Sequence, residues 1–260
     1  MASREAVVGA LAGCTGTAAT MLVSHPLDTV KTRVQVQGWV AWKTLLHRPF
    51  LGISPHLVWY AMFNTIRFAS FAGARRTVEE KLGFRGWVSA GVAGSVSGLV
   101  TGASLHPFFV VKAFQQATNS SLVPACRQLY EAESMWAFTR AFHLSCLRFP
   151  IGVGSFFAVN EVARPSDPKS YTQRAAAGGL AGATAWTLVM PLDVLQSRLM
   201  GQPVAPGRRY HGAVDCARTL LREHGPRVFV TGYSLAIFRA VPVSAILLPV
   251  CESLSAFFRQ

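Results

Sequence analysis

Three prolines in closely similar surroundings recur along the chain at nearly equal spacing. The segments around them begin at His25, His106 and Met190 and read "HPLDTVKTRVQ", "HPFFVVKAFQQ" and "MPLDVLQSRLM", which places the prolines 81 and 84 residues apart. A period of this length that returns in phase indicates a chain built from copies of one structural unit. The repeat is therefore the strongest constraint on the fold, because every copy must adopt similar local structure.

An apolar segment rich in small residues precedes each proline. Thirteen residues before the prolines stand Gly13, Gly94 and Gly178, each with an alanine just ahead of it. Small residues at matching depth let helix backbones approach closely in lipid. Every copy then passes through a polar stretch into a second apolar segment, which covers residues 55–75, 142–163 and 233–256. Segments of ~20 apolar residues span a bilayer as helices. The pattern predicts an all-α membrane protein of six transmembrane helices, in three helix–loop–helix repeats with pseudo-threefold symmetry.

The composition agrees with a membrane protein and argues against a soluble helical one. Of the 260 residues, 51% are hydrophobic and only 14% are charged, against about 25% charged in an average soluble domain. The formal charge of +13 raises the question of nucleic acid, but the basic residues are dispersed and no nucleic-acid module is present. The anionic surface of a membrane is the expected partner.

Charge also orients the spans. We divide the chain into repeats 1–85, 86–170 and 171–260. The loops within the repeats carry a net charge of +9, and the connectors between repeats carry +3. The more basic loops are expected to face the negative compartment, which puts both termini on the opposite side. The loops are residues 31–50, 112–140 and 196–227, and the connectors are residues 75–86 and 161–174.

The first proline segment carries a family signature. Pro26, Asp28 and Lys31 fit the pattern proline, acid, base at spacing P-x-[DE]-x-x-[KR]. Three such segments in phase, each after a glycine-rich span, resemble the mitochondrial carrier family (solute carrier family 25) over the whole chain. The local sequence around these motifs is most similar to members 45, 47 and 48 of the family, a branch that groups with the acylcarnitine and basic amino-acid carriers. The resemblance implies a solute carrier of the mitochondrial inner membrane, not an enzyme, with both termini towards the intermembrane space.

By this resemblance, an acid of one repeat pairs with a base of the next, in a ring that closes a gate on the matrix side. The order implies the pairs Asp28–Lys112 and Asp193–Lys31. The third pair is absent, because Phe109 and Gln196 stand at its positions. Losing both partners avoids stranding one buried charge, which costs about 3–5 kcal/mol. Glutamines that brace these pairs in the family are Gln35 and Gln116.

The family's second gate, on the cytoplasmic side, is less complete. Its [FY]-[DE]-x-x-[KR] pattern is present only in part at the ends of the second segments. The ring order would set Glu161 or Glu252 against Arg164 or Arg75. A loose outer gate is expected, and the first loop, residues 35–52, is also short. Only the third loop keeps the expected family pattern.

Ionisable residues inside membrane spans are candidates for function. Arg67, Arg148 and Arg239 lie in the second apolar segments, and no carboxylate neighbours Arg148 or Arg239 in sequence. Guanidinium groups suit carboxylate or phosphate, so these residues favour an anionic solute that neutralises them, whereas the branch resemblance favours carnitine-like or amino-acid solutes. The alternative is that the arginines only pair with neighbours or snorkel. The complete candidate site is Trp59, Tyr60, Arg67, Arg148, Phe149 and Arg239.

The sequence says less about catalysis, cofactors, metals and lipids. No catalytic triad, phosphate-binding loop, cofactor motif or metal-ligand spacing is present, and the five cysteines form no C-x-x-C pair. The family resemblance implies bound cardiolipin at the glycine-bearing corners near Gly212 and Gly225, and a monomer. A different class of function stays open, namely a carrier-fold membrane adaptor or insertion factor that does not transport, because gate residues are missing and loops are short.

Overall fold

The computed structural model describes residues 25–36, 47–50, 53–163, 171–204 and 207–238, and all regular secondary structure in these ranges is helical. The all-α class is therefore confirmed. Residues 25–36 and 233–238 are helical stretches. The other helices are α3 (Ile53–Lys81), α4 (Gly86–Ser104), α5 (His106–Thr118), α6 (Leu122–Glu133), the 3-10 helix η1 (Ser134–Thr139), α7 (Phe142–Ala163), α8 (Tyr171–Gly201), α9 (Ala213–His224) and the 3-10 helix η2 (Pro226–Val230).

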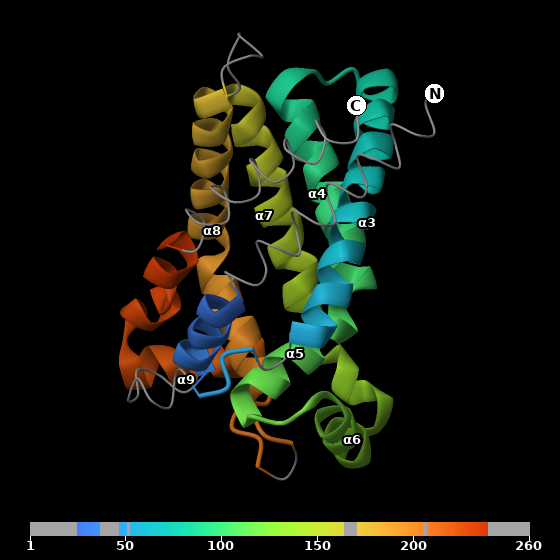
Figure 1. Cartoon of the computed structure of the whole chain (residues 1–260). Helices are drawn as coiled ribbons and strands as arrows, with labels where there is room; N and C mark the ends of the chain where they lie inside the picture. Colours follow the sequence, from blue (N-terminus) through green and yellow to red (C-terminus); the bar gives the residue numbers. More distant parts are fainter. Residues whose placement is uncertain (1–24, 37–46, 51–52, 164–170, 205–206, 239–260) are drawn as a thin grey trace, which may run out of the picture.

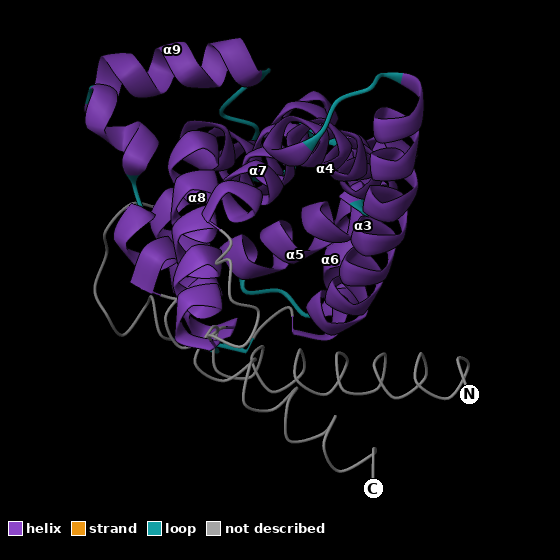
Figure 2. Ribbon diagram, turned by 90° about the horizontal axis from the view of Figure 1, so that it is seen from above, coloured by secondary structure: helices purple, strands orange, loops and turns teal. Residues whose placement is uncertain are grey.

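Four long helices stand side by side, and the shorter ones gather at one end of them. Figure 1 shows α3, α4, α7 and α8 upright, with α5, α6 and α9 below. The packing order across the row is α3, α4, α7 and α8, which Figure 2 shows from above. Helix α7 thus packs between α4 and α8, and this position decides which side chains its residues can reach.

Glycines let α4 and α7 pack backbone to backbone. A Cβ atom at Gly98 would lie 2.4 Å from the carbonyl oxygen of Phe149, and one at Gly94 would lie 2.8 Å from that of Val153. Larger residues would force the two helices apart. The small-residue prediction is confirmed at Gly94, whereas Gly178 has no described atom within 4 Å of such a Cβ. Gly13 lies outside the described residues.

The repeated prolines act differently in different copies. Helices α4 and α5 meet at an angle of 63°, and Pro107 is the second residue of α5. Proline lacks a backbone N–H and favours the first turn of a helix, which agrees with a new helix that starts there. Pro191, in contrast, lies inside α8 without ending it. The second copy therefore bends sharply at its proline, whereas in the third copy α8 continues through Pro191. The segment before Pro26 in the first copy lies outside the described residues.

Membrane-spanning length and composition are met by part of the described chain. Helix α7 and residues Ala176–Gly201 of α8 qualify, and the bent pair α4–α5 qualifies as a third span. Exposed apolar side chains on these helices, such as Val162, Leu180 and Leu188, are 53% exposed or more, as expected of surfaces that face lipid. The six-span arrangement stays a prediction, because residues 1–24 and 239–260 lie outside the described ranges.

The second and third copies share one layout at the end where the short helices gather. In each, a 12-residue helix follows the long helix and leads into a 3-10 turn, as α6–η1 and α9–η2. The second loop thus has the same layout, although only the third loop keeps the family's sequence pattern. Helix α6 escaped notice because Ser134 stands where the third copy has a glycine-bearing corner, and Ser134 nevertheless adopts a positive φ of 56°.

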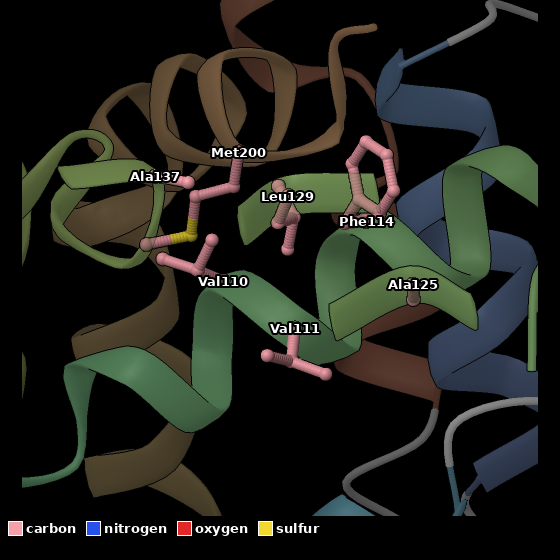
Figure 3. Packing of buried hydrophobic residues seen from close by; sticks show 7 residues of the cluster. All are labelled: Val110, Val111, Phe114, Ala125, Leu129, Ala137 and Met200. Atoms are coloured by element: carbon pink, nitrogen blue, oxygen red, sulfur yellow. The ribbon is translucent and has the colours of Figure 1, made fainter. Parts of the chain in front are cut away.

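Two apolar clusters fix these loops to the long helices. The first joins α5, α6, η1 and the end of α8, as Figure 3 shows. The second joins α9 and η2 to α7 and α8. Burial of such side chains contributes ~25 cal/mol per Å² of apolar surface, so both loops are held rigidly beside the ends of α5 and α8. The first cluster contains Val110, Val111, Phe114, Ala125, Leu129, Ala137 and Met200, and the second contains Leu144, Leu195, Leu199, Tyr210, Cys216, Leu220 and Val228.

Candidate functional site

The carboxylate of Asp193 is the centre of a buried charged network. Its Oδ2 atom pairs with Nζ of Lys31 and accepts a hydrogen bond of 2.8 Å from Nε2 of Gln35. Its Oδ1 atom lies 2.8 Å from Nη2 of Arg148. The side chains of Asp193 and Lys31 are only 7% and 9% exposed. One carboxylate therefore pairs with two cations from different helices, and the Asp193–Lys31 pair has the expected partners.

A second pair lies between residues 25–36 and α5. Nζ of Lys112 lies 3.6 Å from Oδ2 of Asp28, which is the other pair implied by the family order. Gln116 donates a hydrogen bond of 3.1 Å to Oγ1 of Thr29, the residue after Asp28. This pair is longer than the contacts of Asp193 and its lysine is 17% exposed, so it is the weaker of the two.

Arg148 has a carboxylate partner on another helix. No acid neighbours it in sequence, but Asp193 on α8 pairs with it because α7 and α8 pack side by side. This contact is of the kind that the alternative expectation described, in which the arginine pairs with a group of the protein. A second nitrogen, Nη1, lies 3.5 Å from Oε1 of Gln196. Arg148 therefore belongs to the charged network in addition to its expected place in a solute site.

Apolar and neutral groups occupy the third gate position. The ring of Phe109 lies 4.9 Å from that of Phe149, and Phe149 in turn lies 6.0 Å from Phe63. Gln196 donates a hydrogen bond of 2.7 Å to Ser145. Phe149 is 7% exposed, so its side chain packs within the protein rather than facing an open site. No charge is stranded at this position within the described residues.

Arg67 has surroundings of a different kind. Its guanidinium lies 4.7–5.8 Å from the ring centres of Phe63, Phe68, Phe156 and Phe157. Its Nε atom is buried without a hydrogen-bond partner, and no carboxylate pairs with it among the described residues. The interaction of a cation with aromatic faces offsets only part of the loss of water. This guanidinium is therefore able to bind an anion.

The other solute candidates are described only in part. Tyr60 on α3 is half-buried, with its ring 6.4 Å from that of Phe63. Trp59 lies on α3, and its side chain is outside the description, as is Arg239 altogether. Arg67 lies eight residues beyond Trp59 on α3, which corresponds to ~12 Å along the helix axis.

The opposite end of the helices has one of the expected cytoplasmic contacts. Nη2 of Arg75 lies 2.8 Å from Oε1 of Glu161, which links α3 to α7. Arg75 also contacts Glu79, one turn further along α3, at 2.8 Å. Arg164 and Glu252 lie outside the described residues.

Two further residues lie beside the charged network. Sequence reasoning missed Arg33, which is fully buried and bridges the first and second copies, with Nε 3.1 Å from the carbonyl oxygen of Gln116 and Nη2 2.6 Å from Oδ1 of Asn119. The signal that could have found it is a second cation two residues after Lys31. Trp186 on α8, which the sequence offered as an aromatic ring able to hold a cation, lies beneath Lys31, whose Nζ is 4.2 Å from the ring centre.

A further network ties the second loop to the third. Glu133 pairs with both Arg140 and Arg208, and Arg140 donates a hydrogen bond of 3.0 Å to the carbonyl oxygen of Gln202. Burial alone would raise the pKa of the Glu133 carboxyl, but hydrogen bonds from both arginines and their charges outweigh burial and lower it to about 2. The two loops are therefore joined by a carboxylate that stays ionised near neutral pH.

Comparison with known proteins agrees with this arrangement. Residues 3–44 and 167–260, just over half of the chain, match the family model described as mitochondrial carrier protein. The "Mitochondrial basic amino acids transporter" of Bos taurus is 28% identical over 90% of this chain and 87% of its own length. "Solute carrier family 25 member 45" of Mus musculus is 28% identical over 94% of this chain and 95% of its own.

A third relative, the "Mitochondrial carnitine/acylcarnitine carrier protein" of Mus musculus, is 27% identical over 90% of this chain and 89% of its own length. Proteins of this family are transporters of the mitochondrial inner membrane and not enzymes. The repeated proline motifs, the helical fold and the interlocking ion pairs thus have one explanation, which is that the chain belongs to the mitochondrial carrier family.

Proposed function

We propose that this chain carries a small anionic or carboxylate-bearing metabolite across the mitochondrial inner membrane by alternating access. One observation carries the proposal: Arg67 holds a guanidinium inside the helix row with aromatic rings around it and no carboxylate partner among the described residues. A cation of this kind is costly to keep without an anion. A solute carboxylate supplies the missing charge and can form two parallel hydrogen bonds to it.

Arg148 supplies a link from the solute to the gate. It shares Asp193 with Lys31. A solute carboxylate that reaches Arg148 competes with Asp193 for the same guanidinium. Weakening that contact removes part of what holds α7 to α8, beside the Lys31–Asp193 pair that holds α8 to residues 25–36. Solute binding thereby offsets part of the free energy needed to open the matrix gate.

The solute class follows from charge and from the relatives. The arginines Arg67 and Arg148 favour a carboxylate or phosphate, and Arg239 joins them in the proposed site. The relatives are named for basic amino acids and for carnitine and acylcarnitine, all of which bear a carboxylate. We therefore infer an amino-acid, carnitine-like or nucleotide solute. Trp59 and Tyr60 are proposed to line the same site.

The lipid contact is also a proposal. Gly212 stands just before α9, and the first turn of that helix leaves backbone N–H groups open to an anion. A cardiolipin phosphate suits this corner. We expect the carrier to act as a monomer, with both termini in the intermembrane space.

The test is exchange by the purified chain in cardiolipin-containing liposomes, screened with labelled carboxylates, amino acids and nucleotides. We expect exchange of at least one carboxylate-bearing solute, and a loss of tenfold or more for Arg67→Ala, on the scale of one charged hydrogen bond. Arg76→Ala, an exposed position on the same helix, is the matched control and should keep its rate. No uptake of any solute by folded protein would favour the adaptor or insertion-factor function instead.

A further inference from the structure

A pocket of ≈ 540 Å³ opens at the end of the molecule where the short helices gather. It lies between the end of α8, the corner after α9, and the residues that lead into the helical stretch 233–238. Its described charged lining consists of Arg198, Arg209, His224 and Arg227, and no acidic side chain of the described residues contributes to it. This volume falls within the usual range for small-molecule sites.

Arg198 is the unusual member of this lining. The residue is only 6% exposed, and its Nε atom is buried without a hydrogen-bond partner. No hydrogen bond or ion pair of its guanidinium occurs within the described part of the chain. A buried guanidinium that has lost water without gaining a partner is unfavourable by several kcal/mol in general. Natural proteins seldom keep such a group unless a ligand completes it.

The acidic groups around the pocket are already occupied. Glu223 at the end of α9 pairs with Arg209, and Asp215 at its start accepts a 3.0 Å hydrogen bond from the backbone N–H of His211. Asp193 on α8 serves Lys31 and Arg148. Burial raises the pKa of the Cys216 thiol to about 11, against the opposing effect of Arg198, so this neighbour is neutral at physiological pH. None of these groups neutralises Arg198.

We propose that this pocket binds a phosphate group, with Arg198 as its central contact and Arg209, Arg227 and His224 at its rim. Three arginines and a histidine favour a dianion over a monovalent anion, and the planar guanidinium matches the oxygen spacing of phosphate. The pocket adjoins the Gly225 corner, one of the two expected to hold cardiolipin, because His224 and Arg227 line it. Its proposed contacts are arginine and histidine side chains, whereas such a corner binds an anion through backbone N–H groups. Phosphate chemistry is shared by free phosphate, soluble phosphate esters and anionic phospholipid headgroups.

The pocket also adjoins the charged network. Thr231 lines it, and the carbonyl oxygen of Thr231 lies 3.5 Å from Nε2 of Gln35, the same nitrogen that contacts Asp193. Thr231 therefore connects the pocket to Gln35, the glutamine that braces the Lys31–Asp193 pair. The proposal does not depend on the solute or on transport, because none of the candidate solute residues that the structure describes lines the pocket.

The first measurement titrates inorganic phosphate into the full chain, purified in an uncharged detergent without lipid, at constant ionic strength set with chloride. Phosphate should raise the apparent Tm of the natural protein in a saturable way, because it binds only the folded state. Arg198→Gln should weaken phosphate binding about tenfold or more. Arg222→Gln, at an exposed position of α9 outside the pocket, should leave it unchanged.

A second arm separates the two sources of phosphate. In nanodiscs of uncharged phosphatidylcholine, added cardiolipin is compared with inorganic phosphate. Stabilisation by cardiolipin alone that is lost in Arg198→Gln assigns the pocket to a lipid headgroup, and stabilisation by free phosphate assigns it to a soluble anion. Equal responses of Arg198→Gln and the natural protein in both arms would overturn the proposal.

The effect on stability without ligand provides an independent check. Because Arg198 is an unpaired buried cation, Arg198→Gln in phosphate-free buffer should keep or raise the apparent Tm. A lower Tm combined with an unchanged phosphate response would show a purely structural arginine and contradict the site. If Arg198→Gln does not fold, Arg227→Gln at the exposed rim should weaken phosphate binding up to about fivefold, and unchanged binding would likewise overturn it.

Discussion

Arg67 and Arg148 are two arginines inside the helix row that the sequence presents as similar candidates, and the structure gives them opposite surroundings. Arg148 contacts a carboxylate at 2.8 Å and an amide oxygen at 3.5 Å. Arg67 contacts four phenylalanine rings. The difference teaches that the residue type alone does not separate a gate cation from a solute contact. The neighbouring helix decides, since α7 packs on α8 and its acid, whereas α3 packs on α4.

The largest loss of stability is expected on substitution of Asp193, the carboxylate that pairs with Arg148 and Lys31. Asp193→Asn leaves Lys31 and Arg148 as buried cations without their carboxylate, and we expect a loss of about 3 kcal/mol or more in stability. Asp28→Asn is the matched control and should lose less, because Lys112 is more distant from its acid and more exposed. Apparent Tm in the same detergent compares the two. An equal drop in apparent Tm for the two variants would mean that the Arg148–Asp193 contact adds nothing to stability.

A smaller loss of stability is expected at the pair of Arg140 and Glu133 in the loops. Arg140, like Arg148, has a carboxylate partner. The pKa of Glu133 is lowered from 4.5 to about 2. A carboxyl with a lowered pKa stabilises the folded state fully above its unfolded value and loses that effect as pH falls. The Tm difference between the natural protein and Glu133→Gln should therefore be constant above about pH 5 and shrink between pH 4.5 and 2. A difference that does not change over this window would contradict the pairing.

Much of the architecture followed from the sequence, because the constraints were local and repeated. The proline period and the apolar segments predicted the helical segments of α7 and α8, and the family resemblance implied which acids and bases of distant motifs would pair. The sharp bend near Pro107 and the unbroken helix at Pro191 could not be separated, because the local motif is similar in both copies and tertiary packing decides between them.

The site was harder to predict than the fold. The contact of Arg148 with Asp193 depends on helix packing across 45 residues of chain, and no local pattern reports it. Arg198 has the same position relative to its motif as Arg33, two residues beyond the gate position, but Arg33 is buried with hydrogen-bond partners and Nε of Arg198 is buried without one. Packing of the loops, which the residue pattern does not encode locally, makes that difference.

The most direct test of the account is whether Arg67 binds a carboxylate. The solute found by exchange is compared with its neutral amide, as stabilisers of the purified chain, in the natural protein, Arg67→Ala, Arg67→Lys and the control Arg76→Ala. We predict that the carboxylate raises the apparent Tm and the amide does not, that Arg67→Ala abolishes the shift, and that Arg67→Lys restores only part of it because the paired hydrogen bonds are lost. A full shift in Arg67→Ala, or equal stabilisation by the amide, would contradict the account.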